Sequence, residues 1–164
     1  MSAFTAAGVL PYSVSGGCKH YYFGHERSTN TLTTFCGKKN KNEKTLACAI
    51  REFGEESLGA IAKKKHVYKC IKNGNSTKKV ANLAVKQMTY IAKVNIKGDP
   101  VKKFEKKIKK PGLKKHQKEI KKIVEISGPK LRQLVSTGQT SYKGIKFRAD
   151  TFGTLQKALA NNQL

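Results

Sequence analysis

The stretch that decides the fold is GKKNKNEKTLACAIREFGEESLGAI, residues 37–61. The chain has ten Asp and Glu residues against thirty-four Lys and Arg residues, and four of those ten acids, Glu43, Glu52, Glu55 and Glu56, fall inside this stretch. Carboxylates that lie so close together repel one another unless a cation intervenes. A divalent metal is the simplest reason for such a cluster in so basic a chain.

The periodicity of residues 44–57 predicts a helix that carries these acids on one face. Apolar residues recur at i, i+4 and i+7 and form a separate stripe, at Leu46, Ile50 and Phe53. Glu52, Glu55 and Glu56 stand at i, i+3 and i+4 and therefore share a face. Carboxylate oxygens are the ligands that Mg²⁺ prefers, and Arg51 is spaced to orient them. The alternative is a solvated acidic helix end that binds no metal.

With this pattern the chain resembles the Nudix hydrolases. Their box reads Gly, five residues, Glu, seven residues, Arg-Glu, a bulky apolar residue, any residue, Glu-Glu, any residue, Gly. The positions that match it in register are Gly37, Glu43, Arg51, Glu52, Phe53, Glu55 and Glu56. The terminal glycine is displaced by one residue, because position 58 is Leu58 and Gly59 follows. Since that glycine closes the helix, we expect a last turn that is one residue longer or differently closed.

The resemblance implies an α/β fold, an α/β/α sandwich with a mixed central sheet, and hydrolysis of a diphosphate linkage. It also implies a Mg²⁺ ion, or Mn²⁺ in its place, with ligands Glu52, Glu55, Glu56 and the carbonyl of Gly37. Glu52 would act as ligand or base, while Glu43 and Arg51 would orient the ligands. Members of the family often use a further acid from outside the box, and the candidates here are Glu105, Glu119 and Glu125.

Length and composition bound the class of protein. We expect one domain over residues 1–164, with 38% hydrophobic residues, no apolar run of the ~20 residues that span a bilayer, and no signal-peptide pattern at the N-terminus. The cysteines show no CxxC pair, which argues against zinc or a disulfide framework and favours reduced thiols, at Cys18, Cys36, Cys48 and Cys70. We therefore expect a cytoplasmic protein, in the host cytoplasm if the chain is viral.

A net charge of +24 and a pI near 10.1 indicate an anionic partner. Lysines that flank Glu43 in the box loop are candidates for contact with substrate phosphate: Lys38, Lys39 and Lys41. A lysine-rich segment at about 99–122 adds further candidates for RNA contact, Lys102, Lys103 and Lys106. The alternative is that these lysines are simply solvated. The chain prefers Lys to Arg, which suggests that part of the excess of basic residues reflects composition and not phosphate binding.

Patterns along the rest of the chain predict the remaining elements. Strands are expected at residues 7–14, 20–25, 32–36, 66–71, 88–96, 123–126 and 144–147. Pro11 suggests an edge or bulge in the first strand. Helical stripes are expected at residues 101–108, weakly at 113–124, and after an N-cap at Asp150, while Ser127 is expected to cap a turn. Of the aromatic run at residues 21–23, at least one ring is expected to point away from the core, where it would stack on a base or pack on the sheet surface.

The resemblance and the charge together favour one function. We expect mRNA decapping that releases m7GDP, since the lysine-rich style of the chain also resembles Nudix proteins of large DNA viruses. Hydrolysis of a small anionic pyrophosphate is the alternative enzyme: a diphosphoinositol polyphosphate, a dinucleoside polyphosphate or a free nucleotide. A Nudix scaffold that binds RNA or a nucleotide without catalysis is the alternative from another class.

Overall fold

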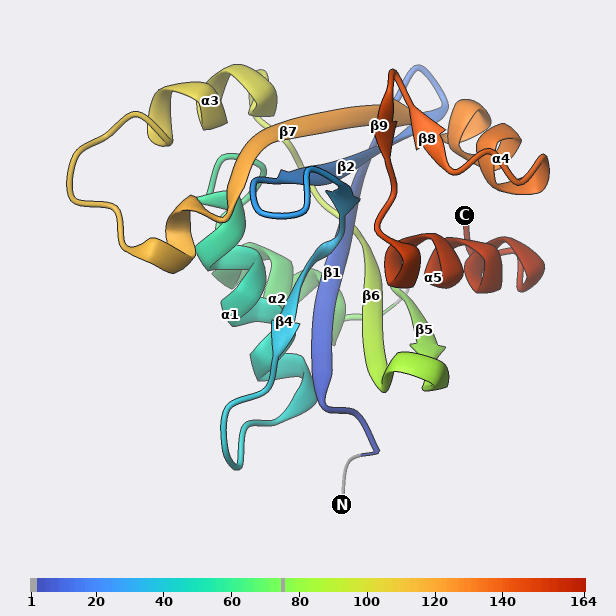
Figure 1. Cartoon of the computed structure of the whole chain (residues 1–164), viewed down its shortest axis with the longest axis horizontal. Helices are drawn as coiled ribbons and strands as arrows, with labels where there is room; N and C mark the ends of the chain where they lie inside the picture. The colour runs from blue at the N-terminus through green and yellow to red at the C-terminus, as the bar shows by residue number, and fades with distance from the viewer. Residues whose placement is uncertain (1–2, 75) are drawn as a thin grey trace.

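A mixed seven-stranded sheet lies between two groups of helices in the computed structural model, which describes residues 3–74 and 76–164 (Figure 1). The strands of this sheet are β1 (Ala6–Ser15), β2 (Cys18–Glu26), β3 (Leu32–Thr33), β4 (Phe35–Lys38), β5 (Lys78–Asn82), β6 (Gln87–Lys93) and β7 (Ile120–Ser127). A separate two-stranded sheet pairs β8 (Ser141–Tyr142) with β9 (Ile145–Lys146). The helices are α1 (Thr45–Ser57), α2 (Lys64–Lys72), α3 (Pro100–Lys107), α4 (Gly128–Ser136) and α5 (Ala149–Ala160), with 3₁₀ turns η1 (Leu83–Val85) and η2 (Lys115–Lys118).

The central strand, β1, has a divided edge. Along one edge it pairs with β6 in parallel, and β6 pairs with β5. Along the other edge it pairs first with β4, up to Val9, and then with β2, from Tyr12 onward. β2 continues away from β1 to pair with β7 and β3, so β2 and β7 cross one end of the molecule in Figure 1. The sheet therefore splits beside β4, and the box begins at this split.

Pro11 lies at the same split, which corrects the expectation of an edge or bulge. β1 is the central strand, but neither β4 nor β2 pairs with Leu10 or Pro11 along the divided edge. A residue without a backbone N–H is tolerated there because no ladder hydrogen bond is required from it.

Each face of the sheet has its own hydrophobic core. Helices α1, α2 and α3 cover one face, where the rings of Phe35 and Phe53 meet edge to face with centroids 5.6 Å apart. Helices α4 and α5 cover the other, where Phe23 meets Phe147 at 5.6 Å (Figure 1). Such aromatic contacts add to the free energy of burial of these large side chains. The expected α/β/α sandwich is therefore the observed fold.

The aromatic run at residues 21–23 is buried, contrary to the expected exposed ring. Tyr21 and Phe23 lie in the core beneath α4 and α5, and Tyr22 lies in the core on the opposite face. The side chains alternate as a strand requires. Because helices cover both faces of the sheet, neither face leaves a ring free to stack on a base.

The strand predicted at residues 66–71 is wrong, because this segment is helix α2. Val67 and Ile71, four residues apart, are buried on one face of the helix, and the lysines of α2 face solvent. The short run of Val, Tyr, Cys and Ile suggested a strand by composition. Its burial follows the helical period instead.

Several boundaries also differ from the expectation. The strand expected at 88–96 is β6, which ends at Lys93, and the weak stripe at 113–124 contains only η2 before β7 begins at Ile120. Ser127 caps a full helix, α4, by accepting a hydrogen bond from the backbone N–H of Lys130. Asp150 lies in the first turn of α5, whose N-cap is Arg148.

The end of α1 has a leucine at the position where the resemblance leads us to expect a glycine. The helix ends at Ser57, and Leu58 itself adopts the left-handed conformation, with φ of 53°. Gly59 is also left-handed, with φ of 66°. The last turn is therefore not longer; a leucine occupies the conformation that favours glycine, at a cost of about 1–2 kcal/mol.

Among the described residues, no helix is both long and apolar enough to span a membrane. Cys18, Cys36, Cys48 and Cys70 are free thiols.

Alanine substitutions at two glycines test the close approach of β4 to β1. A Cβ at Gly8 would overlap the Cβ of Cys36 and the carbonyl oxygen of Phe35, so Gly8→Ala should lower the free energy of unfolding by about 2 kcal/mol or more. The matched control is Gly153→Ala in α5, where a Cβ would lie 3.5 Å from the Asn82 amide nitrogen. That change should raise stability by roughly 0.5–1 kcal/mol. Urea denaturation measures both free energies of unfolding. A Gly8→Ala variant as stable as the wild type would contradict the register of β4 against β1.

Candidate active site

Helix α1 presents its acids to the split in the sheet. Glu52 lies directly against Gly37 of β4, because a Cβ built on Gly37 would overlap the Glu52 carboxylate. A side chain at this position would displace the Glu52 carboxylate, and glycine leaves room for it. The carbonyl of Gly37 accepts a weak hydrogen bond from the thiol of Cys48 at 3.4 Å. Gly37 and Glu52, fifteen residues apart in sequence, are thus two walls of one site.

Arg51 joins three of the box carboxylates. Its guanidinium donates two hydrogen bonds to Glu43, at 2.8 and 2.9 Å, one to Glu52 at 2.6 Å and one to Glu55 at 3.3 Å. It also donates to the carbonyl of Lys38 at 3.0 Å. The hydrogen bonds from Arg51 lower the pKa of Glu43 to about 2. Arg51 therefore has the geometry of an orienting residue, with Glu43 fixing it in place.

Glu56 is the buried acid of the cluster. Only 4% of its surface is exposed, and its Oε2 atom has no hydrogen-bond partner among the described residues. Burial raises the pKa of Glu56 well above its ordinary value, and the nearby charges of Glu52 and Glu119 raise it further. Burial also raises the pKa of Glu52, although Arg51 acts in the opposite direction. A cation at this point would satisfy the unpaired oxygen and remove the repulsion.

A pocket of about 410 Å³ opens over these acids. It is lined by Cys36, Gly37, Lys38, Asn40, Arg51, Glu52, Glu55, His116 and Glu119. His116 and Glu119 come from the lysine-rich segment and the start of β7, and the His116 ring lies 4.0 Å from the Glu55 carboxylate. The segment at 99–122 therefore forms part of the wall of the site.

The three candidate acids from outside the box lie in different places in the structure. Glu119 lines the pocket, whereas Glu105 is exposed on α3. Glu125 forms an ion pair with His20 at 2.7 Å, at a different cavity of about 760 Å³ at the far ends of β1 and β2. Glu119 is the candidate that the geometry retains, and its role in catalysis stays a prediction.

The candidate phosphate-contacting lysines are distributed unevenly. Lys38 lines the pocket, while Lys39 and Lys41 lie in the loop between β4 and α1, outside the pocket lining. Lys102, Lys103 and Lys106 lie on α3, also outside that lining.

Sequence reasoning did not predict His116 or Arg148 at this site. Arg148 lies behind Cys36, donates to its sulfur at 3.1 Å, and forms ion pairs with Glu26 at 3.4 Å and Asp150 at 2.7 Å. Neither residue belongs to a motif. They reach the site through long-range pairing, of β7 with β2 and of Leu32 with Phe147.

The donor set at the site fits a hard divalent cation. Within the described parts of the chain, no three His, Cys, Asp or Glu side chains already converge as a metal cage. Glu52 and Glu55 are hydrogen-bonded to Arg51 instead. The unpaired oxygen of Glu56 and the close-set Gly37 are nevertheless features that carboxylate coordination of Mg²⁺ or Mn²⁺ would use.

Comparison with known proteins supports the fold assignment. No protein-family model matches the chain, and no curated protein sequence matches it. Its structure is similar to a C. elegans Ap4A hydrolase in a binary complex, with TM-score 0.56 and 17% identity over 96% of this chain and 97% of that one. A MutT/nudix family protein from Enterococcus faecalis gives TM-score 0.52 and 14% identity over 95% and 60% of the two chains. RenU, a Nudix hydrolase from M. smegmatis, gives 0.50 and 10% over 99% and 88%. The chain has the Nudix hydrolase fold.

The buried carboxyl of Glu56 gives a testable pH dependence in metal-free protein. Because folding raises the pKa of Glu56, its protonated form favours the folded state. That contribution is complete below about pH 4.3, the ordinary glutamate pKa, and is lost as pH rises through the folded-state value. In EDTA at neutral pH, Glu56→Gln should therefore be more stable than the wild type, and the difference should shrink toward pH 4.

Urea denaturation across this pH range measures the effect. Glu105→Gln, at an exposed carboxylate on α3, is the matched control and should change stability little at any pH. A Glu56→Gln variant that is less stable than the wild type at neutral pH in EDTA would show that the carboxylate has a partner.

Proposed function

We propose that this protein is a Mg²⁺-dependent hydrolase of diphosphate linkages and that its substrate is capped mRNA, from which it releases m7GDP. The observation that carries the proposal is one pocket in which Glu52 and Glu55 are oriented by Arg51, with Glu56 buried beneath and Glu119 opposite. Solved structures with this fold include proteins named as hydrolases.

The ligands of the metal would be Glu52, Glu55, Glu56 and the carbonyl of Gly37. Mn²⁺ suits the same oxygen donors. When bound, the ion supplies positive charge to a phosphate oxygen and lowers the pKa of a water molecule.

The residues of the chain perform the remaining tasks. Arg51 holds Glu52 and Glu55 in position, and Glu43 holds Arg51. In hydrolysis, a water oxygen bonds to phosphorus, the bridging P–O bond breaks, and a carboxylate accepts the proton of the water. Glu52 lines the pocket and is therefore a candidate for this role as well as for metal ligation. Glu119 lines the same pocket and is the second candidate for proton transfer.

Among the described residues, the lysines carry positive charge that no nearby carboxylate neutralises, and this supports the proposal of a long polyanionic substrate. Every ion pair among the described residues uses an arginine or a histidine, and none of the thirty lysines lies within ion-pair distance of a carboxylate. A surface of this kind attracts polyanions over a long range and binds phosphates by counterion release. Capped RNA combines such a backbone with a phosphoanhydride bridge at its end.

A dinucleoside polyphosphate is the second candidate substrate. The structure with TM-score 0.56 is named as an Ap4A hydrolase, and a pocket of about 410 Å³ has the size of a small-molecule site. A non-catalytic RNA-binding scaffold is the remaining alternative, and the intact set of acids argues against it.

Turnover of cap-labelled RNA with Mg²⁺ tests the activity. The wild type should release labelled m7GDP, and Glu52→Gln should lower the rate by at least about 10²-fold, the usual contribution of a group that transfers a proton. Glu105→Gln, with the same chemical change at an exposed site, should retain the rate.

The same assay with Ap4A separates the alternatives. Turnover of Ap4A without release of m7GDP would contradict decapping and support the second candidate. Absence of turnover with either substrate, in protein that binds Mg²⁺, would contradict the enzyme and support the scaffold.

Thermal unfolding with and without metal tests the ligands separately from turnover. A ligand that binds only the folded state stabilises it by about 2.7 kcal/mol at one hundred times its Kd, so saturating Mg²⁺ should raise the Tm by several degrees. Glu56→Gln should lose most of this increase, while Glu105→Gln should keep it. An unchanged wild-type Tm at millimolar Mg²⁺ would contradict the metal site.

A further inference from the structure

A groove extends from the carboxylate pocket across the outer face of α1. A hollow of about 340 Å³ adjoins the pocket and shares Arg51 and Glu55 with it. A second hollow of about 390 Å³ shares Arg51 and Lys64 with the first, and reaches Tyr68 on α2. These neighbouring hollows share lining residues, and we call them together the α1 groove.

The lysine-rich segment provides the other wall of this groove. A hollow of about 310 Å³ shares Gly54 and Gln117 with the first hollow and is lined by Lys107 and Lys110. Lys107 donates a hydrogen bond to the carbonyl of Leu58 at 2.9 Å, which fixes the segment against the end of α1. The α1 groove therefore has fixed walls on two sides, α2 on one and the segment at 99–122 on the other.

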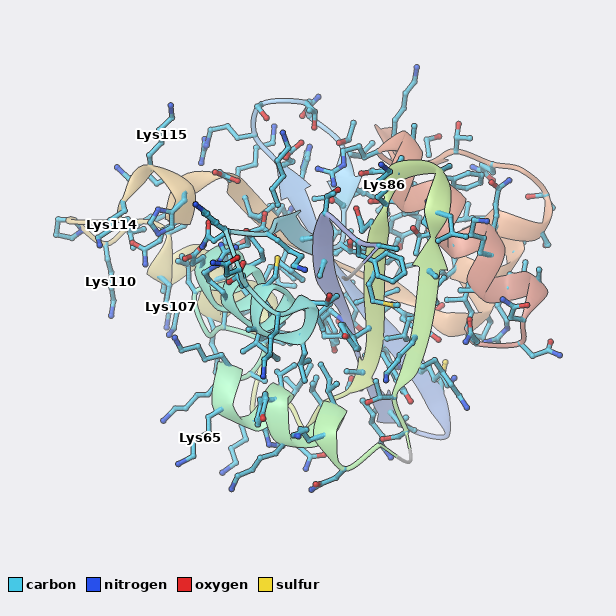
Figure 2. The ribbon with its side chains drawn as sticks, turned by 90° about the horizontal axis from the view of Figure 1, so that it is seen from below. Lys65, Lys86, Lys107, Lys110, Lys114 and Lys115 are labelled. Carbon is cyan, nitrogen blue, oxygen red and sulfur yellow. The ribbon has the colours of Figure 1, made fainter. Side chains whose placement is uncertain are left out.

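The walls are basic. Lys63, Lys64 and Lys65 at the start of α2 are exposed, as is Lys110 across the groove. In Figure 2, Lys65, Lys107, Lys110, Lys114 and Lys115 extend from one flank of the molecule, whereas Lys86 lies in a different region. No carboxylate forms an ion pair with any of them among the described residues. A phosphate chain that leaves the pocket would meet several uncompensated ammonium groups.

An exposed aromatic ring lies at the far end of the groove. Tyr68 is 42% exposed, and it is the one aromatic among the large apolar side chains that are exposed in the described residues. It stands beside Lys64 and Lys65 over the apolar side chains of Ala47 and Ile50. An exposed ring between phosphate-binding lysines is the arrangement by which proteins hold single-stranded nucleic acid.

We propose that the α1 groove binds the single-stranded RNA that emerges from the carboxylate pocket, with its phosphates at Lys63, Lys64, Lys65 and Lys110 and one base stacked on Tyr68. The direction of the strand rests on the proposed function, since the hydrolysed end lies in the pocket. Charge favours a polyanion, and the exposed ring favours one that carries bases. The footprint is on α2 and the far part of the lysine-rich segment, away from Lys102, Lys103 and Lys106 on α3.

Binding of an uncapped oligouridylate tests the groove without any need for hydrolysis. A length of about 20 nucleotides exceeds the ~4–16 nucleotides that single-strand sites cover. The triple variant Lys64→Gln, Lys65→Gln, Lys110→Gln should weaken binding at least tenfold. It should also reduce the slope of log affinity against log salt by about 2, since each phosphate contact on a single strand contributes roughly 0.7.

The matched control removes the same charge elsewhere. Lys79→Gln, Lys86→Gln, Lys157→Gln changes three exposed lysines, on β5, at the C-cap of η1 and on α5. It should retain most of the affinity and the slope. Equal weakening by the two triple variants would show diffuse attraction to net charge and would overturn the proposal.

Substitutions at Tyr68 test the base contact. Tyr68→Ala should weaken binding of the oligouridylate roughly 5- to 100-fold, the range measured for stacking of one base, and Tyr68→Phe should bind as the wild type does. An abasic phosphodiester of the same length should not distinguish the three proteins. Wild-type affinity of Tyr68→Ala for the oligouridylate would overturn the base contact, and equal losses with the abasic chain would assign the effect to altered structure.

Turnover of the cap dinucleotide m7GpppA, which lacks an RNA body, separates this inference from the proposed function. The groove variants should hydrolyse it at the wild-type rate while losing turnover of capped RNA at limiting concentration. If the wild type hydrolyses neither substrate yet the groove variants lose oligouridylate binding, the groove stands and the activity is wrong. If capped RNA and m7GpppA are both hydrolysed and the groove variants match the wild type with both, the groove is wrong.

Discussion

The site depends on the hydrogen bonds that the Arg51 guanidinium donates to the carboxylates around it. Glu43 belongs to the loop after β4, and Glu52 and Glu55 belong to α1, so one cation joins the loop to the helix. Its hydrogen bond to the Lys38 carbonyl also joins the end of β4 to this loop and helix. Without this cation, four carboxylates would repel one another in a region where burial weakens the screening by water. Arginine suits the position because its planar group donates several bonds in fixed directions, which a lysine ammonium cannot do.

Two of the arginines have carboxylate partners, whereas the lysines have none among the described residues. Two of the four arginines, Arg51 and Arg148, pair with carboxylates and lie partly buried around the site. The thirty lysines, in contrast, form no ion pair with a carboxylate in the part of the chain that the structure describes. Most of the ten acids have fixed positions, either in these pairs or, like Asp99 at the start of α3, as a helix cap. The net charge of +24 therefore comes mainly from lysines whose charge no carboxylate neutralises among the described residues.

The sequence predicted what depends on local spacing. The helix of the box and its acids follow from periodicity and spacing, and the α/β/α sandwich is what the resemblance of that motif to the Nudix hydrolases implies. Short segments were harder, because α2 has nine residues, of which several are lysines, and its two buried residues fit more than one pattern. Contacts across the fold left no local signal: His116 and Arg148 reach the site only after β7 pairs with β2 and Phe147 with Leu32. The left-handed conformation of Leu58 could not be predicted either, because leucine rarely adopts a positive φ.

The hydrogen bond from Lys107 to the carbonyl of Leu58 has a consequence for the chain entropy of the lysine-rich segment. The segment leaves the sheet after β6 and returns at Ile120, and this contact divides the excursion into two shorter loops. Loop-closure entropy depends on the logarithm of length, so that each doubling costs only about 0.6 kcal/mol. The turn at Pro111 and Gly112, between Lys110 and η2, can therefore change in length at little cost in chain entropy, while α3 and the end of α1 keep their places. His116 and Glu119 follow this turn and belong to the wall of the pocket, so only the turn itself lies apart from the chemistry of the site.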